Sequence, residues 1–307
     1  MNISVILATY NRNDILSVTL NSFVELVVPQ ISWELIVVDN AGNAATKDLV
    51  SSFNGKLPVT YLVETKKGKN NALNAAIACA KGELYVFTDD DIIATPEWLT
   101  EMWEGAKRWP NHSVFGGRIL PHLPAGKEIP IREHFFSQGA YVIADFGIPE
   151  GVYSAGKVWG PNMAIRSNIF SSGYSFNTSV GPDGSSAYIM GSETELTKRL
   201  EEGGYASIYL PKPLVYHQIR EEQLELDWLY GRAFRAGRGA ANIQNEVGFP
   251  LVFGVPRYLF RQLINNFIQI TRAKIACNRY NLFDSTIKLH ITRGMIYQYY
   301  SKAKAGA

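Results

Sequence analysis

Three consecutive carboxylates, Asp89, Asp90 and Asp91, directly follow an apolar run at residues 84–87. Like charges this close together repel one another, and removing each of them from water is costly, so the arrangement needs a cation. Oxygen ligands at the end of a strand suit a hard divalent ion such as Mg²⁺ or Mn²⁺, which completes its shell with water and phosphate. A nucleotide diphosphate is therefore the first ligand to expect. The alternative is a solvated acidic turn before a helix that starts near Pro96.

The spacing of apolar residues predicts the strands and helices that position these carboxylates. Short apolar runs indicate strands, and a period of about 3.6 residues indicates helices between them. Strands that are continuous apolar runs and alternate with helices predict an α/β fold, in which helices cover both faces of a mainly parallel sheet. Strands are expected at 4–8, 34–38, 59–63 and 83–87, and helices at 14–27, 46–53 and 70–80.

Polar side chains gather where three of these strands end. Thr9, Tyr10 and Arg12 follow the first strand, Asp39 ends the second, and the three carboxylates follow the fourth. Ligands of such sheets collect at the carboxyl ends of the strands. Each cluster alone could be a turn or a helix cap, but their joint placement on one edge predicts a single site.

Beyond Gly116 the sequence becomes rich in glycine and proline, with short strands and a clear helix at 193–202. Its last quarter is helical, aromatic and basic. We therefore predict a catalytic domain at 1–225, with a nucleotide-binding half at about 1–110 and an acceptor and catalytic half at about 111–225, and a helical extension at 226–307.

Charge differs between these regions. Residues 1–225 contain 18 basic and 25 acidic side chains, whereas residues 226–307 contain 12 basic and 3 acidic ones, which favours two different tasks. No run of about 18 to 20 apolar residues predicts a membrane span. Cys79 and Cys277 have no evident partner, and with no secretory signal this favours a reducing cytoplasm.

Five segments follow one another in an order that one enzyme family also shows. They are VILATYNR, VVDN, GKNNALNAAIACAKGELYVFTDDD, WGPNMAIRS and GSETELTKRL, and they span roughly residues 1–220. In this order they resemble the glycosyltransferase family 2 enzymes of GT-A fold. The resemblance implies transfer of a sugar from a nucleotide-diphosphate sugar, with UDP as the default, to an acceptor hydroxyl with inversion at the anomeric carbon. It also implies a Mn²⁺ or Mg²⁺ cofactor.

The resemblance implies roles for the residues that would bind the nucleotide. It places Thr9, Tyr10 and Arg12 beside the base, ribose and phosphates, and Asp39 where a carboxylate accepts a hydrogen bond from the base. Lys69 lies at the start of a predicted helix, a placement suited to phosphate. A solvated lysine is the alternative.

The same resemblance implies the metal ligands. Asp91 would bind the metal directly, Asp89 would belong to the ribose and metal-water shell, and Asp90 is an ambiguous member of the donor site. His217 lies where many such enzymes place a third ligand of the metal or diphosphate, although a hydrogen-bonded surface histidine is the alternative. Leu73 replaces an arginine found in many relatives, which leaves the source of positive charge near the diphosphate open.

The catalytic base is implied by the segment GSETEL, in which Glu193 takes the place of the family's catalytic aspartate. Glutamate is one methylene longer, and a shift of about 1 Å in a reacting group can cost on the order of a hundredfold in rate. Glu195 is therefore a competitor, and Asp183 is a third candidate. Both glutamates could instead be acidic residues in the first turn of a helix.

The loop around WGPNMA resembles the one that shapes the pocket for the donor sugar and acceptor. Trp159 offers an apolar face on which a sugar ring can stack, and Asn162 can bind hydroxyls. Glu195 is assigned to the same pocket. A core position for Trp159 is the alternative.

Residues 250–307 contain 9 basic side chains and one acidic side chain, Asp284. A second helix is expected after Asp284 as its N-cap. Such a basic, apolar surface suits an anionic membrane, with packing on the catalytic domain or on a second copy as the alternative. Nucleic acid is not expected. The apolar stripe of the first helix consists of Phe260, Leu263, Ile264, Phe267, Ile268 and Ile270.

These features predict an inverting, metal-dependent sugar transferase in the cytoplasm, at the inner face of the cell membrane, that builds a surface polysaccharide or another glycan on a glycan or lipid-linked acceptor. A nucleotidyltransferase is an alternative, although residues 8–12 lack the glycines of a phosphate-binding loop. A nucleotide-sugar-binding module without turnover is another alternative, because Ser192 and Leu73 depart from the family pattern.

Overall fold

The computed structural model describes residues 1–185, 188–243 and 249–305. The chain forms two compact units, and the second takes segments from the middle of the chain as well as from its end. The predicted catalytic domain at 1–225, with its two halves, and the helical extension at 226–307 stay a prediction. Unit 1 consists of Met1–Leu123, Tyr141–Gly184 and Ser192–Ile219, and unit 2 consists of Pro124–Ala140, Ser185–Gly191 and Arg220–Ala307.

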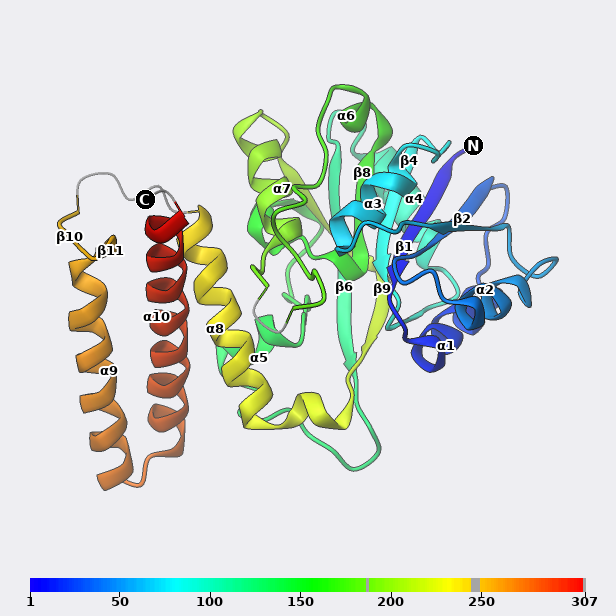
Figure 1. The fold of residues 1–307 in the computed structure, drawn as a ribbon. Coiled ribbons are helices and arrows are strands. Elements are labelled where there is room, and N and C mark those ends of the chain that lie inside the picture. Colours follow the sequence, from blue (N-terminus) through cyan, green and yellow to red (C-terminus); the bar gives the residue numbers. More distant parts are fainter. Residues whose placement is uncertain (186–187, 244–248, 306–307) are drawn as a thin grey trace. The chain divides into compact units, whose positions relative to one another are not determined.

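A mixed β-sheet lies at the centre of unit 1 (Figure 1). Its strand order is β3-β2-β1-β4-β8-β6-β9-β5, and β7 pairs with β9. The first four of these strands are parallel, as predicted. Their bounds are β1 (Ile3–Thr9), β2 (Trp33–Asp39), β3 (Val59–Val63) and β4 (Leu84–Asp89). The others are β5 (Ile92–Ala94), β6 (Val114–His122), β7 (Gly151–Tyr153), β8 (Met163–Arg166) and β9 (Ser207–Gln218).

Helices cover both faces of this sheet, which confirms the predicted fold class. Val5 and Leu7 of β1 belong to the apolar core with α1 and α4, whereas Ile6 belongs to the opposite core with α3 and α7. The alternation follows from the two-residue period of a strand. The helices of unit 1 are α1 (Asn13–Val24), α2 (Ala44–Ser51), α3 (Lys69–Ile77), α4 (Trp98–Arg108), α6 (Ser167–Ser171) and α7 (Ser192–Glu202), with the short 3₁₀ helices η1 (Ala155–Lys157) and η2 (Gly160–Asn162).

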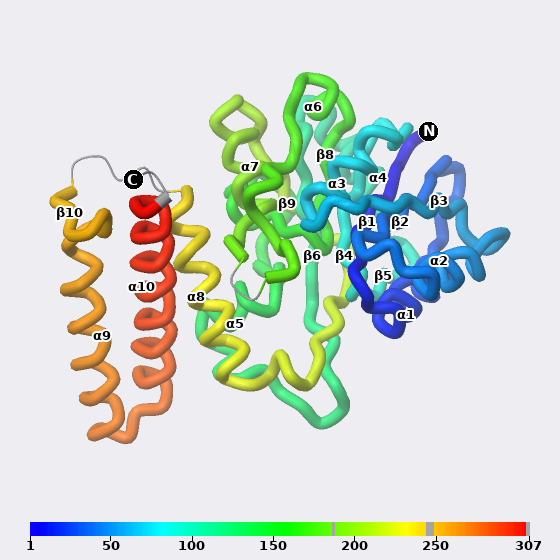
Figure 2. Tube along the Cα trace, viewed as in Figure 1, coloured from blue at the N-terminus to red at the C-terminus, as the bar shows by residue number. Residues whose placement is uncertain are grey.

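Unit 2 is mainly helical, and α10 packs against both α8 and α9 (Figure 2). Gly237 and Gly294 allow α8 and α10 to approach backbone to backbone, because a Cβ at either position would lie 2.0 Å from a carbonyl oxygen of the other helix. In the described part of the chain, no helix combines the length and the apolar character that a membrane span requires. The elements are α5 (Phe135–Ala140), η3 (Glu221–Leu224), α8 (Leu226–Ile243), β10 (Leu251–Val252), β11 (Val255–Pro256), α9 (Arg257–Ile275) and α10 (Arg279–Ala305).

One predicted helix boundary is wrong. Asp284 is not an N-cap, because α10 begins five residues earlier, at Arg279. The Asp284 carboxylate instead pairs with the Lys288 ammonium at 2.7 Å, an i,i+4 ion pair on the surface of the helix.

Candidate active site

The strand ends that carry the predicted polar clusters lie side by side in the sheet. Thr9 of β1 is in register with Asp39 of β2, and Ala8 is in register with Asp89 of β4. The three parallel strands therefore end at one edge, as the sequence predicted. The site is built on this edge of unit 1.

Arg12 pairs with two of the three carboxylates. Its Nη1 donates to Asp90 Oδ1 at 2.6 Å, and its Nη2 donates to Asp91 Oδ2 at 2.7 Å. The Thr9 hydroxyl donates to the other oxygen of Asp90 at 2.7 Å. Asp90 is thus almost fully buried and bound from two sides, which makes it the carboxylate that fixes the β1–α1 loop to the end of β4.

Lys69 connects the carboxylates to the predicted catalytic base. It is the first residue of α3, and its ammonium lies 2.6 Å from Asp89 Oδ1 and 2.9 Å from Glu193 Oε1. Its backbone amide donates to the carbonyl of Pro182 at 2.9 Å. Residues that lie 124 positions apart in the sequence, Lys69 and Glu193, thereby share one ion pair.

Glu193 occupies a place that its neighbours shape. The Ser192 hydroxyl donates to Glu193 Oε2 at 2.8 Å. Gly160 leaves room for the other oxygen, since a Cβ at this position would lie 2.6 Å from Glu193 Oε1. The serine that departs from the family pattern therefore orients the longer glutamate.

The pKa values of this network follow from burial and ion pairing. Burial raises the pKa of Asp90 to about 7, and the charges of Asp91 and Asp89 add to this, although Arg12 opposes it. Burial alone would raise the pKa of Glu193, but the Lys69 ammonium outweighs it and lowers that pKa to about 2. Glu193 is thus ionised in the absence of ligands, with Lys69 as its counter-ion.

His217 lies beside Asp91, because β9 pairs with β5 and sets His217 opposite Ile92. The His217 Nδ1 lies 3.0 Å from the Tyr141 carbonyl oxygen, which can only accept a hydrogen bond, so Nδ1 carries the proton. Nε2 lies 3.6 Å from Asp91 Oδ1. Burial lowers the pKa of His217, but the Asp91 carboxylate outweighs it and raises the pKa above its ordinary value.

Asp91 Oδ1 is a buried carboxylate oxygen that accepts no hydrogen bond from the part of the chain that the structure describes. An anionic oxygen of this kind, beside an imidazole nitrogen, fits a divalent cation. Within that same part, no three His, Cys, Asp or Glu side chains converge to hold a metal ion. The remaining ligands of such a cation would have to be water and phosphate oxygens, as is common for Mg²⁺.

Asp39 has a structural role in the edge. It is fully buried, and its carboxylate accepts hydrogen bonds from the Ala41 amide at 2.8 Å, the Asn43 amide at 2.7 Å and the Tyr61 hydroxyl at 2.7 Å. Burial and this hydrogen bond raise the pKa of Tyr61 to about 12. The predicted hydrogen bond to a nucleotide base stays a prediction, whereas Tyr10, 43% exposed, is open to a ligand.

The predicted sugar pocket is only partly accessible. Trp159 is half-buried, with its ring edge-on to Phe146. Asn162 is fully buried, accepts a hydrogen bond from Trp98 Nε1 at 2.9 Å and donates to the carbonyls of Arg118 and Pro213. This corrects the prediction that Asn162 binds hydroxyls, because its oxygen and nitrogen are already bonded within the core.

Glu195 points to a different partner from that of Glu193. Its carboxylate forms a two-point ion pair with Arg199 one turn along α7, at 2.7 and 3.0 Å. Arg199 also donates to the carbonyl of Ser175 at 2.7 Å. Of these two glutamates, Glu193 is therefore the one that Lys69 joins to the triplet.

Asparagines without a predicted binding role position the loops of the site. Asn40 accepts from the Gly68 amide and donates to the carbonyls of Glu64 and Lys66, which fixes the chain just before Lys69. Asn70 of α3 donates to two carbonyls of the 177–180 loop, at 2.7 and 2.8 Å. The sequence signal that could have identified them is their position, since Asn40 follows Asp39 and Asn70 follows Lys69.

Comparisons with known proteins agree with this geometry. A model of the family "Glycosyl transferase family 2" matches residues 4–170, more than half of the chain. The succinoglycan biosynthesis protein ExoM of Rhizobium meliloti is 24% identical over 247 residues, which cover 78% of this chain and 74% of that protein.

Two solved structures share the fold over nearly the whole chain. The mannosyltransferase PcManGT from Pyrobaculum calidifontis, in complex with GDP-Man and Mn²⁺, has a TM-score of 0.65 at 18% identity and covers 98% of this chain and 88% of its own. S. aureus TarS 1–349 in complex with UDP-GlcNAc has a TM-score of 0.52 at 16% identity and covers 97% and 92%. The chain therefore belongs to glycosyl transferase family 2 and has the GT-A fold.

Proposed function

We propose that this chain transfers a sugar from a nucleotide-diphosphate sugar to an acceptor hydroxyl, with inversion at the anomeric carbon. The observation that carries the proposal is the Lys69 ammonium, which joins Asp89 at the end of β4 to Glu193 at the start of α7. A leaving diphosphate needs cations, and an attacking hydroxyl needs a base. Lys69 lies between Asp89, which belongs to the proposed metal site, and Glu193, the proposed base.

We assign the metal to Asp91 and His217 as its direct protein ligands, with Asp89 in the shell of metal-bound water. When bound, Mn²⁺ or Mg²⁺ would neutralise the charge that develops on the leaving diphosphate. The unbonded Asp91 Oδ1 and the His217 Nε2 beside it support this assignment. The Mn²⁺ bound in the structurally similar mannosyltransferase also supports it.

The protein's own cations would change partners when the donor binds. The phosphates of the donor are stronger hydrogen-bond acceptors for Lys69 and Arg12 than carboxylates that already share a cation. When Lys69 turns to the diphosphate, Glu193 loses the counter-ion that holds its pKa near 2, so its basicity rises. Glu193 then accepts the proton of the attacking hydroxyl, oriented by Ser192.

The donor is proposed to be a UDP-sugar, with Thr9, Tyr10 and Arg12 near its nucleotide and Asp39 behind them. The UDP-GlcNAc bound in TarS supports uridine as the nucleoside of the donor. The GDP-Man bound in PcManGT supports guanosine as the alternative. The acceptor is proposed to be a growing glycan or a lipid-linked sugar in the cytoplasm, and the succinoglycan biosynthesis relative supports a role in polysaccharide assembly.

The proposal is tested by donor turnover with Mn²⁺, using UDP-sugars and GDP-sugars and measuring released nucleoside diphosphate. The Asp91→Ala variant should lose metal-dependent turnover while its cooperative thermal unfolding is retained. Asp145→Ala is the matched control, because Asp145 pairs with Arg118 and not with Arg12 or Lys69. Unchanged turnover in Asp91→Ala would refute the metal assignment, and tight nucleotide binding without any release would indicate a binding module.

A further inference from the structure

Helix α9 exposes the apolar side chains that a soluble helix normally buries. Ile264, Phe267, Ile268 and Ile275 are 61%, 53%, 45% and 81% exposed. We call these four residues the outer face of α9. An amphipathic helix in water turns its apolar stripe inward, so this face is suited to an apolar surrounding that is not water.

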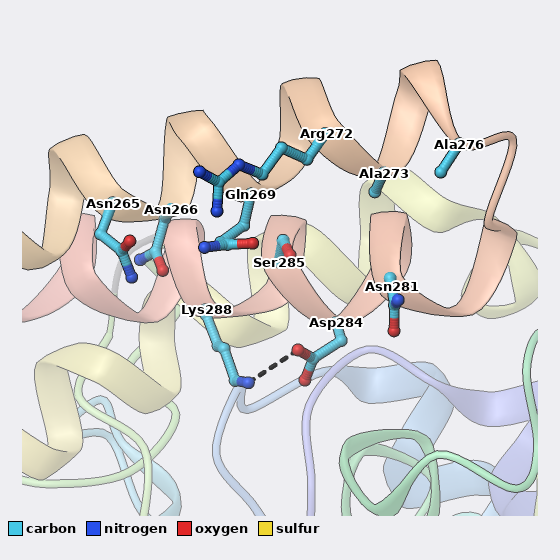
Figure 3. A pocket seen from close by; sticks show the side chains of 10 residues that line it. All are labelled: Asn265, Asn266, Gln269, Arg272, Ala273, Ala276, Asn281, Asp284, Ser285 and Lys288. Carbon is cyan, nitrogen blue, oxygen red and sulfur yellow. Dashed lines mark hydrogen bonds and ion pairs between the residues drawn. The ribbon is translucent and has the colours of Figure 1, made fainter.

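The middle of the side of α9 that meets α10 is polar, whereas Leu259 near the start of the helix packs in an apolar cluster with Met295 of α10. Asn265, Asn266 and Gln269 line a groove of about 390 Å³ between the two helices, and Figure 3 shows their amide groups on this side. Asn266 is 4% exposed, and its Nδ2 lies 3.2 Å from the Thr292 hydroxyl of α10. The helix is therefore anchored to α10 through these amides and through Leu259, and the outer face of α9 is left exposed.

The hairpin before α9 adds a second apolar projection. β10 and β11 lie next to the N-terminal end of α9 (Figure 1). Phe253 at the tip is 82% exposed and has a φ of 52°, a conformation that a bulky side chain rarely adopts. Leu251 beside it is 59% exposed. A strained turn that presents an aromatic ring to solvent is typical of a functional contact.

The charges around this surface have one sign. Residues 247–283 contain no Asp or Glu. Arg257, Arg261, Arg272 and Lys274 are all exposed on α9. Cations beside an apolar face favour a partner that is apolar inside and anionic at its surface.

We propose that the outer face of α9 and the tip of the β10–β11 hairpin bind the surface of an anionic lipid bilayer. A second copy of this chain fits less well, because a two-fold interface would set the same cations against one another. Nucleic acid would satisfy the cations but leave the isoleucines and Phe253 in water. A bilayer satisfies both, with headgroups at the arginines and acyl chains at the apolar side chains.

Flotation of the purified full-length chain with lipid vesicles tests this inference. The chain should float with vesicles of phosphatidylcholine and phosphatidylglycerol at low salt, and binding should weaken at high salt or with phosphatidylcholine alone. The double variant Ile264→Ser, Ile268→Ser keeps every charge, and its partition to the anionic vesicles should fall at least about tenfold. Circular dichroism shows whether this variant is folded.

A second variant tests the hairpin independently of the helix. Phe253→Ser should lower vesicle binding severalfold, whereas Phe135→Ser should not. Phe135 is a matched control, because it is 77% exposed in the same unit but lies on α5. Donor turnover in solution should be unchanged in all these variants, because none of the substituted residues belongs to the active site.

Three outcomes would overturn the inference. The first is that the wild-type chain fails to float at low salt. The second is binding that the serine variants leave unchanged, which would mean that charge alone makes the contact. The third is a wild-type chain that dimerises or binds nucleic acid instead, with the serine variants abolishing that association.

Discussion

At the scale of residues, the acidic edge of the sheet carries its own counter-charge. Two protein cations, Arg12 and Lys69, each bind two carboxylates, and together they reach all of Asp89, Asp90, Asp91 and Glu193. One aspartate of the triplet is structural, since Asp90 is bound by Thr9 and Arg12. Asp90 therefore holds the β1–α1 loop, and Asp89 and Asp91 are left for a ligand.

We expect Glu193→Gln to lower turnover by about a hundredfold or more, because a general base contributes roughly 10² to 10⁴ in rate. Nucleotide affinity should change little, since Lys69 and Arg12 remain. Steady-state release of nucleoside diphosphate measures turnover, and calorimetry with UDP measures affinity.

Glu195→Gln is the matched control for this substitution. It removes the same charge two positions away on α7, where the carboxylate pairs with Arg199. Its turnover should stay within a few-fold of the wild type. If Glu195→Gln loses turnover and Glu193→Gln keeps it, the assignment of the base is wrong.

At the scale of elements, the parallel half of the sheet was predictable because its strands are continuous apolar runs with local signals at both ends. The triplet and Asp39 could be placed on one edge for the same reason. Asn162 could not be interpreted correctly, because its partners, Trp98 and the carbonyls of Arg118 and Pro213, are brought to it only by the folded chain. Nothing local distinguishes a buried amide from a ligand-binding one.

The ion pair between Lys69 of α3 and Glu193 of α7 could not be predicted from the sequence either. Lys69 was expected to meet phosphate, but its ion pair with Glu193 depends on how the loop at 177–182 packs on α3. Asn70 holds that loop through backbone carbonyls, which any sequence supplies. Because these hydrogen bonds go to backbone carbonyls, the side chains of the loop carry no sequence signal for them.

The 3₁₀ helix η2 should be sensitive to a single methyl group. Gly160→Ala would place a Cβ 2.6 Å from Glu193 Oε1, so the carboxylate must move away from Lys69. We expect turnover to fall at least about tenfold, because a displacement of about 1 Å in a reacting group is costly. Unfolding in urea should change much less than turnover.

Gly156→Ala is the comparison for that prediction. Its new Cβ would have 3.8 Å to the nearest atom, the Thr194 side chain, so nothing must move. If both variants lose turnover equally, the added methyl group disturbs the segment at 156–160 and not the position of Glu193.

At the scale of the whole molecule, metal and nucleotide should bind cooperatively. A divalent ion alone must compete with Arg12 and Lys69 for the carboxylates, whereas a diphosphate offers these cations another partner. We expect UDP to tighten Mn²⁺ binding at least about tenfold, and Mn²⁺ to tighten UDP binding by the same factor. Calorimetric titrations of each ligand, with and without the other, measure the coupling.

Lys69→Gln should weaken this coupling, because the ammonium that changes partners is gone. Arg118→Gln should preserve it, since Arg118 pairs with Asp145 and with none of the carboxylates that Lys69 and Arg12 bind. If UDP and Mn²⁺ bind independently to the wild-type protein, Lys69 and Arg12 do not exchange carboxylates for the diphosphate.

The paired state of Arg12 and Lys69 also bears on how the protein can be handled. Since each carboxylate of the triplet already contacts a protein cation, the chain should survive thorough chelation without unfolding. A preparation stripped in this way could be reloaded with one chosen ion at a time. The preference between manganese and magnesium could then be measured without contamination from whatever metal the host cell supplied.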